Sequence, residues 1–307
     1  MSKIINELVL SGGGMTGIAM LGTLHEMYNQ NILNHVKRII GTSIGGIIGF
    51  LINIGYKPNT IFAIINELDF NIFSEINCDN IMMFYDTMGV ADGKPVMTII
   101  HTMMKHKDID HTITFKQLYE ITNVELLITG YNLCTSVTEC FNHIDTPDMS
   151  ILLAIRITIS IPLYFKPVKY NDFLYVDGGI TEPIPIRFCK RRSHSFIISL
   201  SRNKNTITNE IVEKGIEMPD YIGLLFGGIY KSLSTQCLQF QKKYPMNIFI
   251  LKVVGSSLID FNLTKVNKNN IYKQGVDAFI KWNTIHQFPM NSSKNISMSK
   301  KTLDSTT

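Results

Sequence analysis

A single serine between two glycines is the first residue in this sequence whose setting suits covalent chemistry. Ser43 is the centre of Gly41-Thr-Ser-Ile-Gly45, which follows the predicted strand VKRII and precedes an apolar helical stretch. Gly-x-Ser-x-Gly between a strand and a helix is typical of a nucleophile elbow, a strained turn that exposes the serine hydroxyl. An ordinary glycine-rich turn is the alternative. The choice depends on whether the chain also supplies an oxyanion hole and a base.

Three consecutive glycines lie where the predicted strand ELVL runs into a predicted helix. Gly12, Gly13 and Gly14 can adopt positive φ angles, so several backbone N–H groups can face one point. With a helix N-terminus behind it, such a loop can hold an anion or stabilise a developing oxyanion. The pattern Gly12-x-Gly14-x-x-Gly17 also matches a dinucleotide-binding fingerprint, and a tight turn without any ligand is a further alternative.

A dinucleotide-binding site requires an acidic residue that this sequence lacks. Such a site needs an acidic residue about 20 positions after the glycines to bind the ribose hydroxyls. No Asp or Glu occurs between Met27 and Asn66, and no Gly-Lys-Ser/Thr follows that would make a phosphate loop. A dinucleotide-binding oxidoreductase is therefore the least favoured of the function classes considered.

A nucleophilic serine needs a base, and the sequence offers histidine and aspartate candidates. His194 lies in the basic run RFCKRRSH and His286 lies next to a polar C-terminal stretch, so we expect both at the surface. Asp177, in YVDGGI, is followed by two glycines that allow a sharp turn. A free Asp has a pKa of about 3.9 and is a weak base, but a desolvated pocket raises that value. An Asp-Gly turn without a catalytic role is the alternative for Asp177.

These motifs, in this order, resemble those of the patatin-like phospholipase family, over roughly Glu7 to Leu200. The matching segments are Gly12-Gly13-Gly14-Met-Thr-Gly17, Gly41-Thr-Ser43-Ile-Gly45 and Asp177-Gly178-Gly179, with GVADGKP, TFKQLYEIT, LLITGYNL and TPDMSILLAIRITISIPLYFKPV. The resemblance implies a three-layer α/β/α sandwich with a mostly parallel central sheet. It also implies hydrolysis of phospholipids or other acyl-ester lipids by a Ser–Asp dyad, without metal or cofactor.

By position, the resemblance assigns a role to each motif. Ser43 would be the nucleophile, Asp177 the base, and the backbone of Gly12 to Gly14 the oxyanion hole. Two residues depart from the family pattern: Thr16 stands where Arg or Lys is usual, and Pro183 alters the exit from the Asp turn. These departures motivate a second function class, a lipid-binding protein that kept the fold without catalysis.

The elements that must position these residues follow an α/β pattern, because short apolar runs alternate with helical stretches. Strands are predicted at 7–10, 36–40, 124–133, 173–179, 195–200 and 247–254, with 137–142 as a hairpin partner of the third. Helices are predicted at about 16–30, after Ser43, from a cap at Asn59-Thr60, and at 95–105, 114–122 and 146–160. Gly89 to Pro95 is predicted to be a turn.

Composition and charge bound the partners and the location. The 307-residue chain is 45% hydrophobic with a net charge of +4, which permits weak attraction to anionic membranes or nucleic acid but argues for neither. We expect no nucleic-acid partner. The run Arg187 to Arg192 and the lysines Lys294, Lys300 and Lys301 could contact anionic headgroups, although each cluster taken alone favours an ordinary solvated surface. His101, His106 and His111 predict no metal site, because five-residue spacing puts them on different faces of a helix.

We expect residues 1–286 to form one domain and the polar stretch 287–307 to be a disordered tail. The N-terminus has too short an apolar run for a signal peptide, and the five cysteines form no CxxC pair, as in reduced intracellular proteins. Ile39 to Tyr56 is uncharged but glycine-rich, so we expect a buried strand, turn and helix there rather than a membrane span. The predicted location is cytoplasmic, with peripheral membrane contact.

Overall fold

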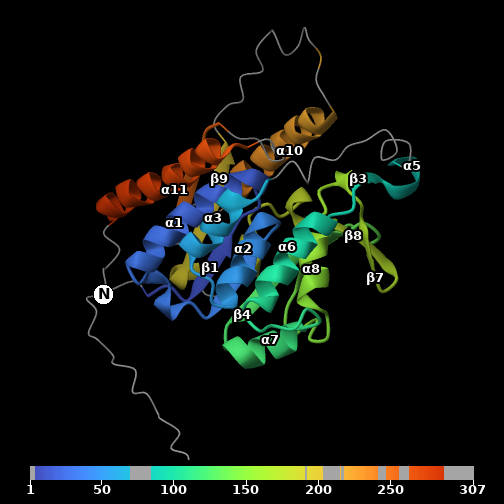
Figure 1. The fold of residues 1–307 in the computed structure, drawn as a ribbon, viewed down its shortest axis with the longest axis horizontal. Coiled ribbons are helices and arrows are strands. Elements are labelled where there is room, and N and C mark those ends of the chain that lie inside the picture. Colours follow the sequence, from blue (N-terminus) through green and yellow to red (C-terminus); the bar gives the residue numbers. More distant parts are fainter. Residues whose placement is uncertain are drawn as a thin grey trace, which may run out of the picture.

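We describe the fold from a computed structural model of the chain. It describes residues 4–69, 84–190, 192–202, 215, 218–240, 247–255 and 263–286. The predicted tail at 287–307, with Lys294, Lys300 and Lys301, lies outside the described residues. Figure 1 shows a central sheet with helices around it.

An eight-stranded sheet in the order β10-β9-β1-β2-β4-β8-β7, with β5 paired to β4, forms the centre of the molecule. The strands are β1 (Glu7–Leu10), β2 (Arg38–Gly41), β4 (Glu125–Asn132), β5 (Val137–Phe141), β7 (Val168–Tyr170), β8 (Phe173–Asp177), β9 (Ser195–Arg202) and β10 (Asn247–Val253). Neighbours from β10 to β4 pair in parallel, whereas β5, β7 and β8 pair antiparallel. The predicted α/β class with a mostly parallel sheet is confirmed.

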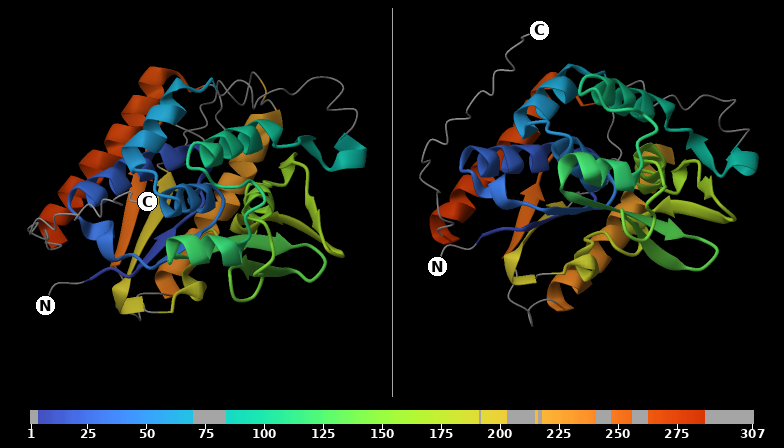
Figure 2. Two further views of the ribbon diagram at one scale, coloured as in Figure 1. Left: turned by 60° about the horizontal axis from the view of Figure 1, so that its bottom comes forward. Right: turned by 90° about the horizontal axis from the view of Figure 1, so that it is seen from below.

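Helices cover both sides of this sheet. They are α1 (Gly17–Asn29), α2 (Ile44–Asn53), α3 (Pro58–Glu67), α5 (Phe84–Thr87), α6 (Lys94–Lys105), α7 (Phe115–Thr122), α8 (Ile151–Thr158), α10 (Met218–Phe240) and α11 (Lys265–His286). Figure 2 (right) shows α1, α3 and α11 on one side of the sheet and α10 on the other. The three layers leave the ends of the central strands as the place where loops from both sides meet.

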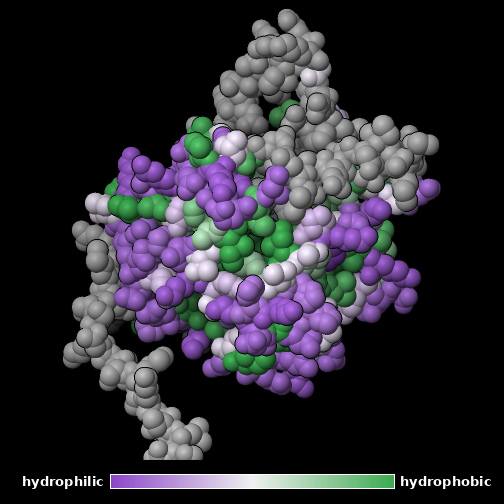
Figure 3. Space-filling model, in the orientation of Figure 1, coloured by the Kyte–Doolittle hydropathy of each residue, from purple (hydrophilic) through white to green (hydrophobic). Residues whose placement is uncertain are grey.

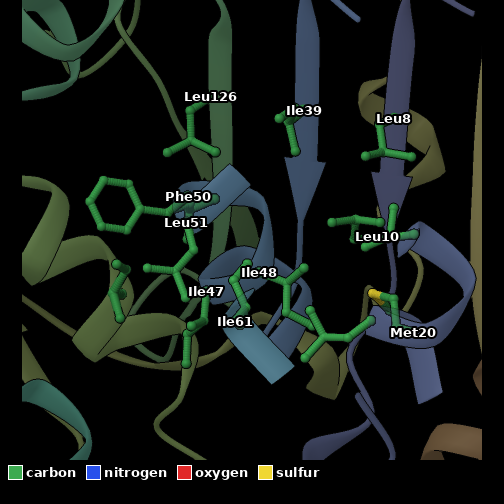
Figure 4. Close-up of a cluster of buried hydrophobic side chains, with 14 of the residues drawn as sticks. Leu8, Leu10, Met20, Ile39, Ile47, Ile48, Phe50, Leu51, Ile61 and Leu126 are labelled. Carbon is green, nitrogen blue, oxygen red and sulfur yellow. The ribbon is translucent and has the colours of Figure 1, made fainter. Parts of the chain in front are cut away.

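The strands bury both of their faces, which explains their nearly continuous apolar sequences. Leu8, Ile39 and Leu126 pack with α1 and α2, whereas their neighbours Val9 and Ile40 face a second cluster. Figure 4 shows the first cluster, in which Leu10, Met20, Ile47, Ile48, Phe50, Leu51 and Ile61 complete the layer. Each such side chain contributes roughly 1.5–3 kcal/mol on burial. This layer therefore fixes β1, β2 and α2 relative to one another.

The uncharged segment from Ile39 to Tyr56 is a buried strand, a turn and a buried helix, as predicted. None of the helices that the structure describes is both long and apolar enough to cross a membrane.

Two helices begin at residues other than those predicted. α3 begins at Pro58, with Lys57 before it, because proline suits the first helical position better than the predicted Asn59-Thr60 cap. α8 begins at Ile151 rather than near Thr146. Ser150 accepts a hydrogen bond from the Leu153 N–H (3.2 Å) and caps this helix.

The predicted turn from Gly89 to Pro95 begins as a strand. β3 (Gly89–Ala91) pairs in parallel with β6 (Leu163–Phe165), and the turn is confined to the residues before α6. A two-stranded sheet of three-residue strands shows too little periodicity to be predicted from sequence.

Candidate active site

Ser43 occupies a strained turn between β2 and α2. Its backbone has φ 55° and ψ −126°, a conformation that non-glycine residues rarely adopt. The turn is tight as well: a Cβ atom on Gly41 would lie 2.5 Å from the backbone of Gly45, and one on Gly45 would lie 2.4 Å from the Leu10 carbonyl oxygen. The Ser43 N–H donates to Thr158 Oγ1 (2.8 Å), which ties the turn to α8. The two flanking glycines are therefore required by close packing.

Asp177 ends β8 and is buried, with 5% of its surface exposed. Its N–H donates to the Ser160 carbonyl (2.9 Å), and its Oδ1 accepts from the Gly179 N–H (2.7 Å). Burial raises the pKa of Asp177 to about 7, while the hydrogen bonds from Gly179 and from the Ser43 side chain act in the opposite direction. The structure thus brings Ser43 and Asp177 together and gives the carboxylate a pKa suited to accepting a proton near neutral pH.

The strand order explains why these two distant residues meet. β4 lies between β2 and β8 and pairs with both, and Gly130 of β4 is opposite Asp177. Thr42 Oγ1 lies 2.8 Å from Thr129 Oγ1 and donates to the Glu182 carbonyl (3.0 Å). A Cβ atom on Gly178 would lie 2.5 Å from Thr129 Oγ1, so only glycine fits there. The serine turn and the aspartate turn are therefore packed against one strand.

The glycine loop lies beside Ser43 and has two positive φ angles, 152° at Gly13 and 54° at Gly14. The Gly12 N–H donates to the Pro183 carbonyl (2.9 Å), so the structure leaves the N–H groups of Gly13 and Gly14 as candidates to bind an oxyanion. Thr16, which stands where the resemblance predicts Arg or Lys, is buried, and its hydroxyl donates to the Gly13 carbonyl (2.6 Å). Thr16 therefore stabilises the loop rather than contacting solvent.

Two pockets meet at Ser43. The smaller, of about 50 Å³, is lined by the glycine loop, Asp177 and Gly179, and closed by Ile161, Pro162, Phe226 and Tyr230. The larger, of about 150 Å³, is almost wholly apolar and lies among α1, α2, α3 and α6, with lining residues that include Ile18, Leu21, Ile47, Ile65, Val96 and Met103. Figure 3 shows apolar side chains gathered between α3 and α6, where this pocket approaches the surface.

Two residues that the sequence did not single out contact the site. The Thr158 hydroxyl oxygen accepts a hydrogen bond from the Ser43 N–H. Tyr230, on α10, donates a hydrogen bond from its hydroxyl to the Gly12 carbonyl (2.6 Å). Thr158 belongs to a segment that carried the family resemblance but has no chemical motif of its own. Tyr230 comes from a helix far along the chain, and no sequence pattern pointed to it.

The histidines lie away from this site. His194 and His286 are exposed, as predicted, and His194 precedes β9, at the opposite end of the strands from Ser43. The rings of His101 and His111 lie 4.9 Å apart, because the chain turns back after α6, so helical spacing alone misjudged their distance. Among the residues that the structure describes, no group of three or more His, Cys, Asp or Glu is placed to hold a metal ion.

Comparison with solved structures supports the fold. The chain superposes on VipD from Legionella pneumophila with a TM-score of 0.59 and 14% identity, covering 92% of this chain and 67% of VipD. It superposes on the type III effector protein ExoU with a TM-score of 0.53 and 15% identity, covering 93% of this chain and 54% of ExoU. At this level of identity the likeness concerns the fold alone.

Sequence relatives include viral and cellular proteins. A probable lipid hydrolase, 463L, of Invertebrate iridescent virus 6 is 36% identical over 187 residues, which are 60% of this chain and 63% of that relative. An uncharacterized protein, R571, of Acanthamoeba polyphaga mimivirus is 27% identical over 89% of this chain and 92% of its own length. Triacylglycerol lipase 4 of Saccharomyces cerevisiae is 25% identical over 58% of this chain and 22% of its own length.

The family model for patatin-like phospholipase matches residues 8–189, which is well over half of the chain. The matched range contains the glycine loop, the Ser43 turn and the Asp177 turn. This chain therefore belongs to the patatin-like phospholipase family.

Proposed function

We propose that this protein is a serine acyl hydrolase that cleaves carboxylic ester bonds of glycerophospholipids or related lipids. The observation that carries the proposal is the meeting of Ser43, in its strained turn, with the buried carboxylate of Asp177 at one pocket beside the glycine loop, where burial raises the pKa of that carboxylate to about 7. A carboxylate with an ordinary pKa would be a poor base at neutral pH, whereas this one is matched to the task.

The reaction would take place in two steps. The Ser43 hydroxyl oxygen attacks the ester carbonyl carbon while Asp177 accepts the hydroxyl proton, and the N–H groups of Gly13 and Gly14 stabilise the oxyanion. The C–O bond to the alcohol then breaks, and the proton on Asp177 passes to the leaving alcohol. In the second step, water gives a proton to Asp177 and its oxygen attacks the acyl carbon. The bond between that carbon and the Ser43 oxygen breaks, the proton on Asp177 passes to the Ser43 oxygen, and a fatty acid is released.

The two pockets support a lipid substrate. The apolar pocket begins at Ser43 and runs beneath α3 and α6, which suits an acyl chain, because such a chain gains free energy on leaving water. The smaller pocket holds the polar atoms of the loop and Asp177 and would receive the ester group.

We further propose peripheral contact with a lipid surface through α10. Tyr221, Leu225 and Ile229 recur at four-residue spacing and are all exposed, and Ile229 also lines the small pocket. The predicted basic run is a weaker candidate, since Arg187 pairs with Glu182 (3.0 Å) and Lys190 with Glu125 (3.1 Å).

The proposal is tested with phospholipids that carry a label at either acyl position. The wild-type protein should release labelled fatty acid, and Ser43→Ala and Asp177→Asn should each lower the rate at least about a thousandfold. Thermal unfolding of each variant controls for loss of the fold.

The alternative function is that of a lipid-binding protein without catalysis, which is motivated by the uncharged Thr16 and by Pro183. This alternative predicts vesicle binding with no released fatty acid in any variant.

A further inference from the structure

The glycine loop receives a hydrogen bond from a residue more than two hundred positions away. Tyr230, on α10, donates its hydroxyl to the Gly12 carbonyl at 2.6 Å, and a Cβ atom on Gly12 would lie 3.5 Å from its ring. The Ser11 hydroxyl donates to the same carbonyl at 2.9 Å. Two donors therefore fix one backbone oxygen in a loop that also lines the Ser43 pocket.

The Gly12 carbonyl belongs to the same peptide group as the Gly13 N–H. A peptide group is planar, and in the trans form its C=O and N–H point in opposite directions. Whatever fixes the carbonyl therefore also fixes the direction of the Gly13 N–H. A hydrogen bond to the carbonyl also polarises the peptide group and makes its N–H a stronger donor.

The backbone of this loop needs such support, because it is unusual. Gly13 has a φ of 152°, and glycine is free to leave such a conformation. The neighbouring hydrogen bonds act on other peptide groups of the loop. The Pro183 carbonyl accepts a hydrogen bond from the Gly12 N–H, and the Thr16 hydroxyl donates one to the Gly13 carbonyl. Among the residues that the structure describes, the Ser11 and Tyr230 hydroxyls are the donors that act on the peptide group carrying the Gly13 N–H.

We propose that Tyr230 is a positioning residue that orients the Gly13 N–H toward the oxyanion and strengthens it as a donor. Tyr230 would act through the peptide group and would not touch the reacting atoms. This inference rests on the proposed function of the Ser43 site. It makes α10 part of the catalytic machinery, although this helix lies beyond the segment that matches the family.

The test compares Tyr230→Phe with Tyr28→Phe, a solvent-exposed tyrosine on α1 that lines neither pocket at Ser43. We expect Tyr230→Phe to lower kcat for a soluble ester roughly tenfold with little change in KM. That is less than the loss of a whole oxyanion donor, because Ser11 still holds the carbonyl. Tyr28→Phe should leave both parameters unchanged.

A second readout separates positioning from a structural role. A trifluoromethyl ketone that mimics the tetrahedral intermediate should lose affinity for Tyr230→Phe by the same factor as kcat/KM, whereas a non-hydrolysable ether analogue of the substrate should bind equally well. Both are measured at a temperature where each variant is fully folded. Equal losses for the two analogues, or unchanged kcat in Tyr230→Phe, would overturn the positioning role. If Ser43→Ala retains activity, the proposed function itself is wrong.

Discussion

At the scale of single residues, burial decides what Asp177 can do. The carboxyl group loses contact with water, and this raises its pKa from 3.8 to about 7 despite hydrogen bonds from Gly179 and Ser43. Exposure at this position would return the carboxylate to its ordinary pKa and remove its value as a base. The proposed chemistry thus depends on the packing around Asp177 as much as on its residue type.

This pKa predicts the pH dependence of the reaction. Only the deprotonated carboxylate can accept a proton, so kcat/KM should rise with pH and level off above an apparent pKa near 7. The measurement is the pH profile of kcat/KM on a soluble ester between pH 4 and 9. A profile that is already flat from about pH 5 upward would contradict a buried base, because an ordinary aspartate is deprotonated there.

The same shift affects stability with a defined sign. Because the pKa of Asp177 is higher in the folded state than in the unfolded state, the folded protein holds a proton that the unfolded chain has lost. This group therefore makes the free energy of unfolding fall as the pH rises from about 4 to about 7. Asp177→Asn should remove that decline and unfold at a higher temperature than the wild type at pH 8. An equal pH dependence in both proteins would count against the raised pKa.

At the scale of elements, the sequence best predicts those strands and turns that are determined by a local pattern of residues. The strands β1, β2 and β4 follow from short apolar runs, and the turns around Ser43 and Asp177 follow from the glycines next to these residues. Thr158 and Tyr230 could not be predicted, because their roles depend on tertiary contacts made by α8 and α10. β6 escaped prediction for another reason: its three residues are held by pairing with β3 rather than by a pattern of their own.

The helix α6 offers a test of the apolar pocket. Val96 lines that pocket, whereas Thr98 on the same helix is exposed. Val96→Trp should fill part of the pocket and lower kcat/KM for long-chain esters relative to butyryl esters by roughly tenfold, since a few lost methylene contacts suffice for such a change. Thr98→Trp is the matched control and should leave the ratio unchanged. A ratio that is unaffected by Val96→Trp would place the acyl chain elsewhere.

At the scale of the whole molecule, the site lies at one edge of the sheet, where β1 and β2 end. Parallel α/β proteins commonly bind ligands at the carboxyl ends of their strands, because loops from both layers meet there. β1 supplies the glycine loop, β2 the serine turn, β8 the aspartate turn, and α10 reaches the loop from the other side of the sheet. The site therefore exists only when segments from the whole length of the chain are assembled.

The most direct test of this assembly is covalent labelling of the nucleophile. Wild type, Ser43→Ala and Asp177→Asn are incubated with an alkyl fluorophosphonate, and the modified residue is located by mass spectrometry. The account predicts a single adduct on Ser43 in the wild type, none in Ser43→Ala, and formation about a hundredfold or more slower in Asp177→Asn. An adduct on another residue, or equal rates in the wild type and Asp177→Asn, would contradict the pairing of Ser43 with Asp177.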